Sequence, residues 1–104
     1  MAISVPRHLQ CAAKQLTDKA TAAGFNGVQV DGNNFSAVVT TVAAAIARAR
    51  TGKGPGLVEC LSDRLSDHST ADDASRYRQK SELEQAREQD PLSLLSDQLR
   101  ARGE

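Results

Sequence analysis

The sequence predicts an α/β fold, in which one strand–helix–strand unit forms part of a parallel sheet. Three observations lead to this class: a short apolar run at residues 28–30, a long stretch with helical apolar spacing at residues 35–50, and a second apolar run at residues 57–61. A helix that connects two strands of one sheet makes them parallel, and this crossover is almost always right-handed. The carboxyl ends of both strands are therefore expected at the same edge of the sheet.

The N-terminal part is predicted to be one helix over Arg7–Ala23. Its apolar residues recur at the spacing of one helical face and are Leu9, Ala12, Ala13, Leu16, Ala20 and Ala23. Gly24 follows as a C-terminal stop. Gly24–Gly27 has the composition of a turn, and Val28–Val30 is expected to be a short strand that ends at Asp31–Asn33.

The second helix is expected from Phe35, with Asn33 or Asn34 as its cap. Its apolar positions are Phe35, Val38, Val39, Val42, Ala45, Ile46 and Ala49. Arg48 and Arg50 place positive charge at the negative end of the helix dipole. The segment that ends this helix contains Gly52, Gly54, Pro55 and Gly56. Leu57–Leu61 then has the length and apolarity of a buried strand.

Two short helices are predicted in the C-terminal segment, residues 79–104. Ser81–Glu84 fits a capping box, and Asp90–Pro91 places a cap residue before a proline at the first helical position. The leucines that follow are Leu92, Leu94, Leu95 and Leu99. Residues 1–104 are thus predicted to form a single partial domain, in which a functional loop at residues 62–78 precedes these helices.

Composition excludes several classes of partner. The chain has 104 residues, with 13 basic and 13 acidic side chains, so its field attracts neither nucleic acid nor anionic lipid. The longest apolar stretch, Ala37–Ala47, is too short for a bilayer, and Met1–Gln15 lacks the apolar centre of a signal peptide. A soluble, cytoplasmic protein is expected, with no nucleic-acid or membrane partner.

Few large apolar side chains are available for a core. The aromatic residues are Phe25, Phe35 and Tyr77, so the core must consist mainly of aliphatic side chains and is expected to be thin. Cys11 and Cys60 show neither metal-ligand nor CxxC spacing, and both are expected to be reduced thiols.

The long polar segment after the second strand is the candidate functional loop. It starts at the carboxyl end of a strand, where ligands bind in open α/β sheets, and it is too long for a plain connection. Its polar residues are Arg64, Asp67, His68, Ser69, Thr70, Asp72, Asp73, Tyr77 and Arg78. Beside a diphosphate, His68 could donate a hydrogen bond or transfer a proton, while Arg64 and Arg78 could pin the loop through Asp72 or Asp73.

Simpler interpretations of this loop remain open. His68 could be an ordinary exposed histidine, and Ser69–Asp72 could be only a helix cap. A small metal-binding module would use His68 with the aspartates, although the EF-hand spacing and its central glycine are absent. The chain contains no Gly-rich phosphate loop and no nucleophile with a base at a fixed spacing.

Residues 64–78, with the sequence RLSDHSTADDASRYR, closely resemble the conserved loop in α subunits of thiamine-diphosphate-dependent 2-oxoacid dehydrogenases, of the pyruvate and branched-chain types. The other similar segments are Ala2–Ser4, Gly27–Gly32, Ala47–Arg50, Gly52–Pro55, Val58–Glu59 and Asp90–Pro91. The resemblance implies a fragment of a thiamine-diphosphate-binding fold. The activity it implies is decarboxylation of a small 2-oxoacid and transfer of the acyl group to lipoamide.

The resemblance also implies roles for loop residues. In the family this loop lies over thiamine diphosphate at the interface with the β subunit, so His68 would be catalytic and would contact the cofactor together with Ser66. The residues that match the family's loop-ordering positions are Arg64, Asp72, Tyr77 and Arg78. Ser69 matches a serine that is phosphorylated in some mitochondrial members, and a phosphate there would repel the cofactor's own phosphates.

Two departures from the family pattern lie in or beside the loop. Asp63 stands where tyrosine is usual, and Ser66–Asp67 replaces a glycine-containing pair. The family's magnesium-binding motif, which begins GDG and ends in two asparagines, would fall before Met1, so no metal ligands are expected in this chain.

The resemblance places the cofactor, thiamine diphosphate with magnesium, in a full-length protein. Its partners would be the β subunit of a heterotetramer and a lipoyl-bearing acyltransferase core. The chain alone is expected to be inactive. The alternative is a non-catalytic remnant that acts only as a subunit-interaction module.

Overall fold

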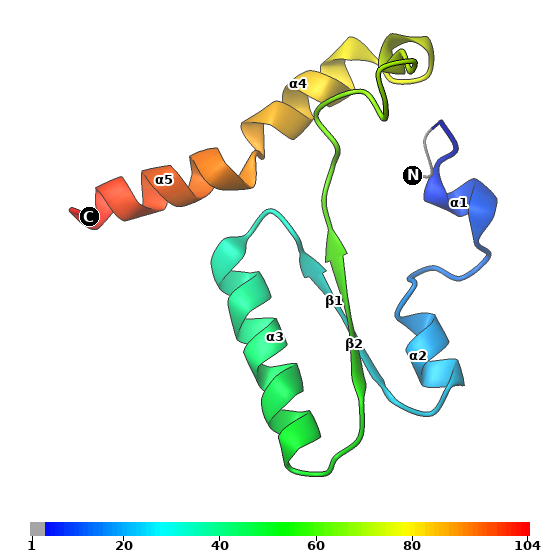
Figure 1. The fold of residues 1–104 in the computed structure, drawn as a ribbon, viewed down its shortest axis with the longest axis vertical. Helices are drawn as coiled ribbons and strands as arrows, with labels where there is room; N and C mark the ends of the chain where they lie inside the picture. The colour runs from blue at the N-terminus through cyan, green and yellow to red at the C-terminus, as the bar shows by residue number, and fades with distance from the viewer. Residues whose placement is uncertain (1–3) are drawn as a thin grey trace. The chain divides into compact units, whose positions relative to one another are not determined.

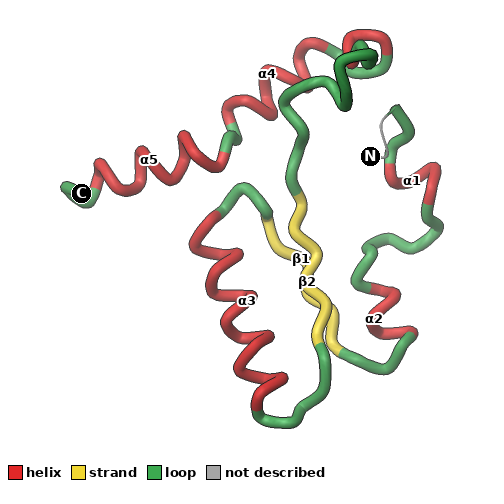
Figure 2. Tube along the Cα trace, in the orientation of Figure 1, coloured by secondary structure: helices red, strands yellow, loops and turns green. Residues whose placement is uncertain are grey.

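A computed structural model describes residues 4–104 and contains a parallel strand pair with short flanking helices (Figures 1 and 2). Its elements in chain order are α1 Arg7–Gln10, α2 Asp18–Ala22, β1 Asn26–Asp31, α3 Phe35–Arg50, β2 Gly56–Leu61, the 3-10 helix η1 Ala74–Arg76, α4 Lys80–Glu88 and α5 Pro91–Ala101. The chain divides into two compact units. One is Ala13–Ser62, and the other combines residues 1–12 with Asp63–Glu104. Of the similar segment Ala2–Ser4, only Ser4 lies among the described residues.

The strand–helix–strand unit is confirmed. β1 and β2 pair in parallel, with Val28 opposite Val58 and Gln29 opposite Glu59. β1 extends beyond the predicted residues 28–30 at both ends, and β2 begins one residue earlier than predicted. α3 connects the two strands and packs on both of them (Figure 1).

The limits of α3 are those that the sequence predicts. The Asn34 side chain caps the helix by accepting a hydrogen bond from the Ala37 N–H at 3.0 Å. Arg48 and Arg50 lie in the last turn. Gly52 follows with φ of 75°, a left-handed conformation that favours glycine after a helix.

The prediction of one helix over Arg7–Ala23 is wrong. The helix is interrupted after Gln10, where Cys11 adopts an extended conformation, and it resumes only at Asp18. Thr17 is buried and donates its backbone N–H to Glu59 Oε2 on β2 at 3.2 Å. A continuous helix would use that N–H for its own ladder, and the alanine-rich face offers little burial in exchange. The contact with the sheet therefore prevails over local helix propensity.

The core is thin, as expected. Among the described residues, the only buried apolar side chains are Ala20 and Ala86, and no large side chain is fully buried. The close contact between α2 and β1 depends on Gly27, where a Cβ atom would lie 2.8 Å from the Thr17 carbonyl oxygen. The chain therefore relies on backbone hydrogen bonds and close glycine contacts more than on a large apolar interior.

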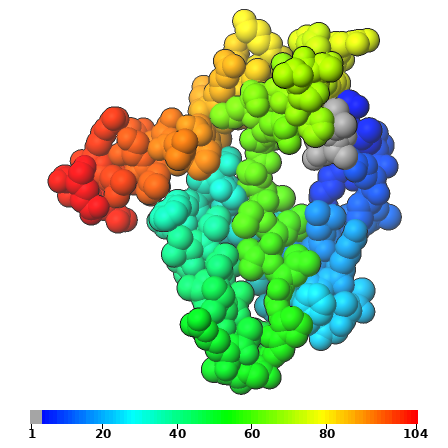
Figure 3. Space-filling model, viewed as in Figure 1, coloured from blue at the N-terminus to red at the C-terminus, as the bar shows by residue number. Residues whose placement is uncertain are grey.

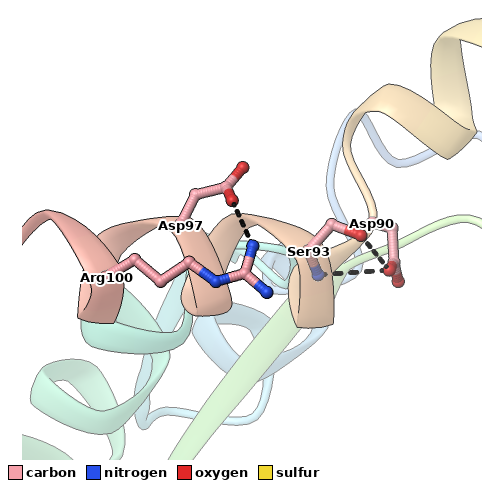
Figure 4. Close-up of polar contacts among 4 residues, drawn as sticks. All are labelled: Asp90, Ser93, Asp97 and Arg100. Atoms are coloured by element: carbon pink, nitrogen blue, oxygen red, sulfur yellow. Dashed lines mark hydrogen bonds and ion pairs between the residues drawn. The ribbon is translucent and has the colours of Figure 1, made fainter. Parts of the chain in front are cut away.

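The C-terminal helices form, but only one of their two predicted caps is confirmed. α4 begins at Lys80 after an extended Gln79, so Ser81 lies inside the first turn and makes no capping box. The early start leaves Glu82 near the positive end of the helix dipole, where an acidic side chain is favourable. Asp90 caps α5 as predicted: its Oδ2 accepts the Ser93 N–H at 3.2 Å and the Ser93 hydroxyl at 2.9 Å (Figure 4). Within residues 4–104, no helix combines the length and apolarity needed to cross a bilayer.

Candidate functional site

The carboxyl ends of the two strands lie directly beside each other. Asp31 pairs with Leu61, and the Gly32 N–H donates to the Leu61 carbonyl oxygen at 2.6 Å. A Cβ atom at Gly32 would lie 2.5 Å from that oxygen, so only glycine permits the contact. The Asp31 side chain accepts the Asn33 N–H at 2.9 Å and so shapes the turn into α3. This confirms the predicted common edge, from which the candidate loop departs along the chain.

The loop itself belongs to the other compact unit. Its conformation is held by aspartates that accept hydrogen bonds from donors within the loop. Asp67 Oδ1 accepts the Ala74 N–H at 2.9 Å. Asp73 caps η1, where its Oδ1 accepts the Ser75 N–H at 3.1 Å and the Ser75 hydroxyl at 2.6 Å. The capping residue is therefore Asp73, one position beyond the Ser69–Asp72 segment considered from the sequence.

Asp72 joins two positions of the loop. Its Oδ2 accepts the His68 N–H at 2.8 Å and the Tyr77 hydroxyl at 2.5 Å. The Tyr77 hydroxyl, and then the His68 N–H, lower the pKa of Asp72 below its ordinary value of 3.8. The same bond to Asp72, and then partial burial, raise the pKa of Tyr77 above 10.0. At neutral pH the pair is therefore a carboxylate with a phenol donor.

The sequence suggested that Arg64 and Arg78 pin the loop through Asp72 or Asp73, and this is wrong. Both arginines donate to backbone carbonyl oxygens instead. Arg64 Nη1 donates to the His68 carbonyl oxygen at 3.3 Å, and Arg78 Nη1 donates to the Arg64 carbonyl oxygen. The two carboxylates already accept hydrogen bonds from closer loop donors. The guanidinium groups consequently tie the two ends of the loop through its backbone.

This arrangement fixes the backbone of His68 and leaves its side chain exposed. The residue donates its N–H to Asp72 and accepts at its carbonyl from Arg64. Its imidazole makes no hydrogen bond or ion pair with the described residues, and Ser66 and Ser69 on either side are exposed as well. A donor or acceptor on a group outside the loop could thus meet the imidazole without displacing an internal contact.

The loop aspartates do not converge on a common point. Across residues 4–104, no group of three or more His, Cys, Asp or Glu side chains is placed to hold a metal ion. Each of Asp67, Asp72 and Asp73 instead accepts from a different set of loop donors. The arrangement offers no support for a metal-binding module at His68.

Sequence reasoning overlooked a buried carboxylate on β2. Glu59 Oε2 accepts from the Thr17 N–H at 3.2 Å and from Gln29 Nε2 at 3.1 Å, while Oε1 has no partner among the described residues. The available signal was a charged residue in the middle of the apolar run 57–61. Cys11 and Cys60 are both free, as predicted.

A protein-family model matches the whole chain, and curated proteins match most of it. The family model described as "Dehydrogenase E1 component" covers residues 1–104. The chain is 46% identical over 91 residues to the 2-oxoisovalerate dehydrogenase subunit alpha of Bacillus subtilis (strain 168), covering 88% of this chain and 28% of that protein. It is 44% identical over 91 residues to the 3-methyl-2-oxobutanoate dehydrogenase subunit alpha of Mycobacterium tuberculosis (strain CDC 1551 / Oshkosh), covering 88% and 25%.

A pyruvate-type relative shows a similar match. The chain is 41% identical over 103 residues to the pyruvate dehydrogenase E1 component subunit alpha of Staphylococcus epidermidis (strain ATCC 12228 / FDA PCI 1200), covering 98% of this chain and 28% of that protein. The chain thus spans about a quarter of the length of the curated relatives it matches.

Proposed function

Because the chain belongs to the dehydrogenase E1 component family, we propose that it forms part of the α subunit of a thiamine-diphosphate-dependent 2-oxoacid dehydrogenase. In this proposal the loop around His68 is one wall of the cofactor site. The family uses thiamine diphosphate, and the names of the relatives point to a small 2-oxoacid as the substrate class. The observation that carries the proposal is a His68 whose backbone is held at both ends while its imidazole is exposed.

We propose His68 as the catalytic residue of this loop. A neutral or protonated imidazole can donate a hydrogen bond, or transfer a proton, near the reacting acyl group. The exposed Ser66 hydroxyl is the second cofactor contact in the proposal. The bonds among Asp72, Tyr77, Arg64 and the His68 backbone support an ordering role, because they keep the imidazole at one position in the loop.

Thiamine diphosphate, when bound, supplies the carbanion chemistry of decarboxylation, and protein groups orient it and stabilise the charges that develop. The described residues fit only part of this group. They present an imidazole and a hydroxyl, but they contain no set of ligands for magnesium. In the proposal this chain therefore contributes the loop, and other parts of a longer α subunit contribute the metal and diphosphate ligands.

The proposed partners complete the site. A β subunit in a heterotetramer would form the opposite wall, and a lipoyl-bearing acyltransferase core would accept the acyl group. Ser69 is exposed and adjacent to His68, so a phosphate there would add about −1.5 to −2 charges next to the cofactor's phosphates. Phosphorylation of Ser69 would accordingly repel the cofactor and disturb the Asp72–His68 contact.

A second candidate function is a subunit-interaction module without catalysis. It is favoured by one observation: several large apolar side chains of the described residues are exposed, and such a surface suits pairing with other subunits. Both candidates predict that the chain binds the β subunit. They differ in whether the loop can support turnover once the rest of an α subunit surrounds it.

Co-expression of the 104-residue chain with a β subunit tests the proposal in its simplest form. We expect the two to co-purify, and we expect no decarboxylation of a 2-oxoacid by the chain alone, even with added thiamine diphosphate and magnesium. Turnover by the purified chain without other subunits would contradict the assignment of a partial site. Failure to bind the β subunit would contradict both candidate functions.

A further inference from the structure

Among the aspartates of the loop, Asp67 makes the contact that spans the most sequence. It directly precedes His68, and its Oδ1 accepts the Ala74 N–H at 2.9 Å, seven residues further along the chain. The side-chain bonds of Asp72 and Asp73 span at most five residues. The atoms of residues 62–78, coloured green to yellow, are in view on the surface in Figure 3. Asp67 therefore closes a short segment of this loop that has His68 inside it.

The closed segment meets the rest of the loop at Ala74. The Ala74 carbonyl oxygen accepts the Tyr77 N–H at 3.2 Å, while its own N–H donates to Asp67. From this turn the Tyr77 hydroxyl reaches back to Asp72, which also accepts the His68 N–H. Asp67 consequently connects the residue before His68 to the turn that carries Tyr77.

The Asp67 carboxylate also acts on Tyr77 through its charge. The pKa of Tyr77 is raised first by the bond to Asp72, then by partial burial and by the charge of Asp72, and further by the charge of Asp67. A negative charge near the phenol disfavours the phenolate, which has no proton to donate to Asp72. Asp67 thus supports the bond between Tyr77 and Asp72 both through the turn and through its charge.

The contacts that fix the His68 backbone come from the loop itself. Its N–H donates to Asp72, its carbonyl oxygen accepts from Arg64, and Asp67 ties the preceding residue to Ala74. A free segment loses conformational entropy when it becomes ordered around a ligand, and this loss weakens binding. A segment that its own hydrogen bonds already close avoids most of this loss.

We propose that Asp67 is a positioning residue, whose bond to the Ala74 N–H orders the His68 segment before the cofactor binds. This inference rests on the function proposed for the loop, in which His68 faces thiamine diphosphate. Asp67 acts through His68 and makes no contact with the cofactor. One hydrogen bond of this kind corresponds to a change of about fivefold in an equilibrium constant.

Amide hydrogen exchange of the 104-residue chain tests this role without the cofactor. Asp67→Ala should lower the protection factors of both Ala74 and His68 about fivefold. Asp67→Asn keeps an acceptor oxygen and should restore most of this protection. Asp63→Ala is the matched control and should leave both values unchanged, because it removes an exposed carboxylate that makes no hydrogen bond or ion pair with the described residues. Unchanged protection in Asp67→Ala, or a loss at Ala74 alone, would overturn the positioning role.

Direct cofactor binding tests the same role in an assembled enzyme. For this measurement the chain replaces the matching segment of the Bacillus subtilis relative, which is assembled with that enzyme's β subunit. Calorimetric titration with thiamine diphosphate and magnesium should give a Kd for Asp67→Ala about fivefold above that for Asp67→Asn. The two variants have the same net charge, so their difference reports the hydrogen bond and not the repulsion between a carboxylate and the diphosphate.

The outcomes separate this inference from the proposed function. Equal Kd values for Asp67→Ala and Asp67→Asn, or tighter binding by Asp67→Ala, would overturn the positioning role. The variant His68→Ala in the same assembly tests the function itself, which an unchanged kcat would contradict. A lowered kcat in His68→Ala together with equal Kd values for the two Asp67 variants would overturn the positioning role alone.

Discussion

The strand pair and the loop around His68 are stabilised by different kinds of hydrogen bonds. In Ala13–Ser62 the contacts are mainly backbone to backbone, between β1 and β2 and along α3, and they depend on glycines where main chains approach closely. In the loop the contacts are mainly from side chains to the backbone, with Asp67, Asp72 and Asp73 as acceptors. A backbone ladder tolerates many side chains, whereas a loop of this kind depends on each polar group separately. Substitutions in the two regions should therefore differ in how far their effects spread.

The largest effect is expected at the end of the strand pair. Gly32→Ala places a Cβ atom 2.5 Å from the Leu61 carbonyl oxygen and 3.0 Å from its carbonyl carbon, so the strands must separate there. We expect the free energy of unfolding to fall by about 3 kcal/mol. Gly56→Ala is the matched control, since a Cβ atom there meets nothing closer than 3.8 Å, and its unfolding curve in urea should barely change. Equal effects of the two substitutions would show that the close contact at Gly32 does not limit stability.

A smaller effect is expected from the buried carboxylate of the same unit. Glu59→Ala leaves the buried Thr17 N–H without its acceptor, so we expect a loss of about 2 kcal/mol, measured by urea unfolding. Glu59→Gln keeps one acceptor oxygen and should lose less. The surface reference is Glu84→Ala, which removes an exposed pair with Lys80 at 3.8 Å and should cost at most about 0.5 kcal/mol.

The Asp90 cap of α5 lies outside both the strand pair and the loop, and its loss should have an effect on stability of intermediate size. Asp90→Ala removes the acceptor for the Ser93 N–H and hydroxyl. We expect it to reduce the free energy of unfolding by about 1 kcal/mol and to lower the helicity of α5. Asp97→Ala removes only the exposed contact with Arg100 at 3.6 Å and should have almost no effect by circular dichroism (Figure 4). A result in the opposite order would contradict the assignment of Asp90 as the cap.

The smallest effect on global stability, and the most local one, is expected in the loop. Tyr77→Phe removes the hydroxyl that bonds to Asp72, so the pKa of Asp72 should rise towards 3.8. Because the native pKa of Asp72 is lowered, its contribution is present above pH 3.8 and is lost as the pH falls through the native pKa. Because the native pKa of Tyr77 is raised, its contribution is present below pH 10.0 and is lost above its native pKa.

Carboxyl and amide NMR shifts of Asp72 and His68 measure this titration directly. The change in the His68 amide shift that accompanies protonation of Asp72 should occur at a higher pH in Tyr77→Phe than in the parent chain. The urea midpoint at neutral pH should be slightly lower in Tyr77→Phe, because the contact between the two side chains contributes to stability at that pH. An unchanged Asp72 titration in Tyr77→Phe would contradict the contact between these side chains.

The same contrast explains which features the sequence could predict. The unit of β1, α3 and β2 and the caps at Asn34 and Asp90 follow from local patterns, because apolar period and capping chemistry act over a few residues. The continuous helix over Arg7–Ala23 failed because Glu59, 42 residues beyond Thr17, takes the Thr17 N–H. Such a long-range contact leaves no periodic signal.

In the loop the sequence identified the polar residues but not their partners. Its segment was recognisable from length and from resemblance, yet the acceptors of Arg64 and Arg78 proved to be carbonyl groups. Backbone carbonyls are present at every residue, so composition cannot indicate which of them an arginine will reach. The apolar positions of α3 were visible as a helical pattern, but only the structure distinguished the half-buried positions from the exposed ones.

The central claim is that the loop around His68 forms one wall of the cofactor site. Its most direct test is a chimeric α subunit, in which this chain replaces the matching segment of the Bacillus subtilis relative and is assembled with that enzyme's β subunit. The kcat for 2-oxoacid decarboxylation should fall at least about a hundredfold in His68→Ala, with assembly unchanged. His8→Ala, an exposed histidine in α1 outside the loop, should leave kcat unchanged. Equal kcat values for His68→Ala and the parent chimera would contradict the claim.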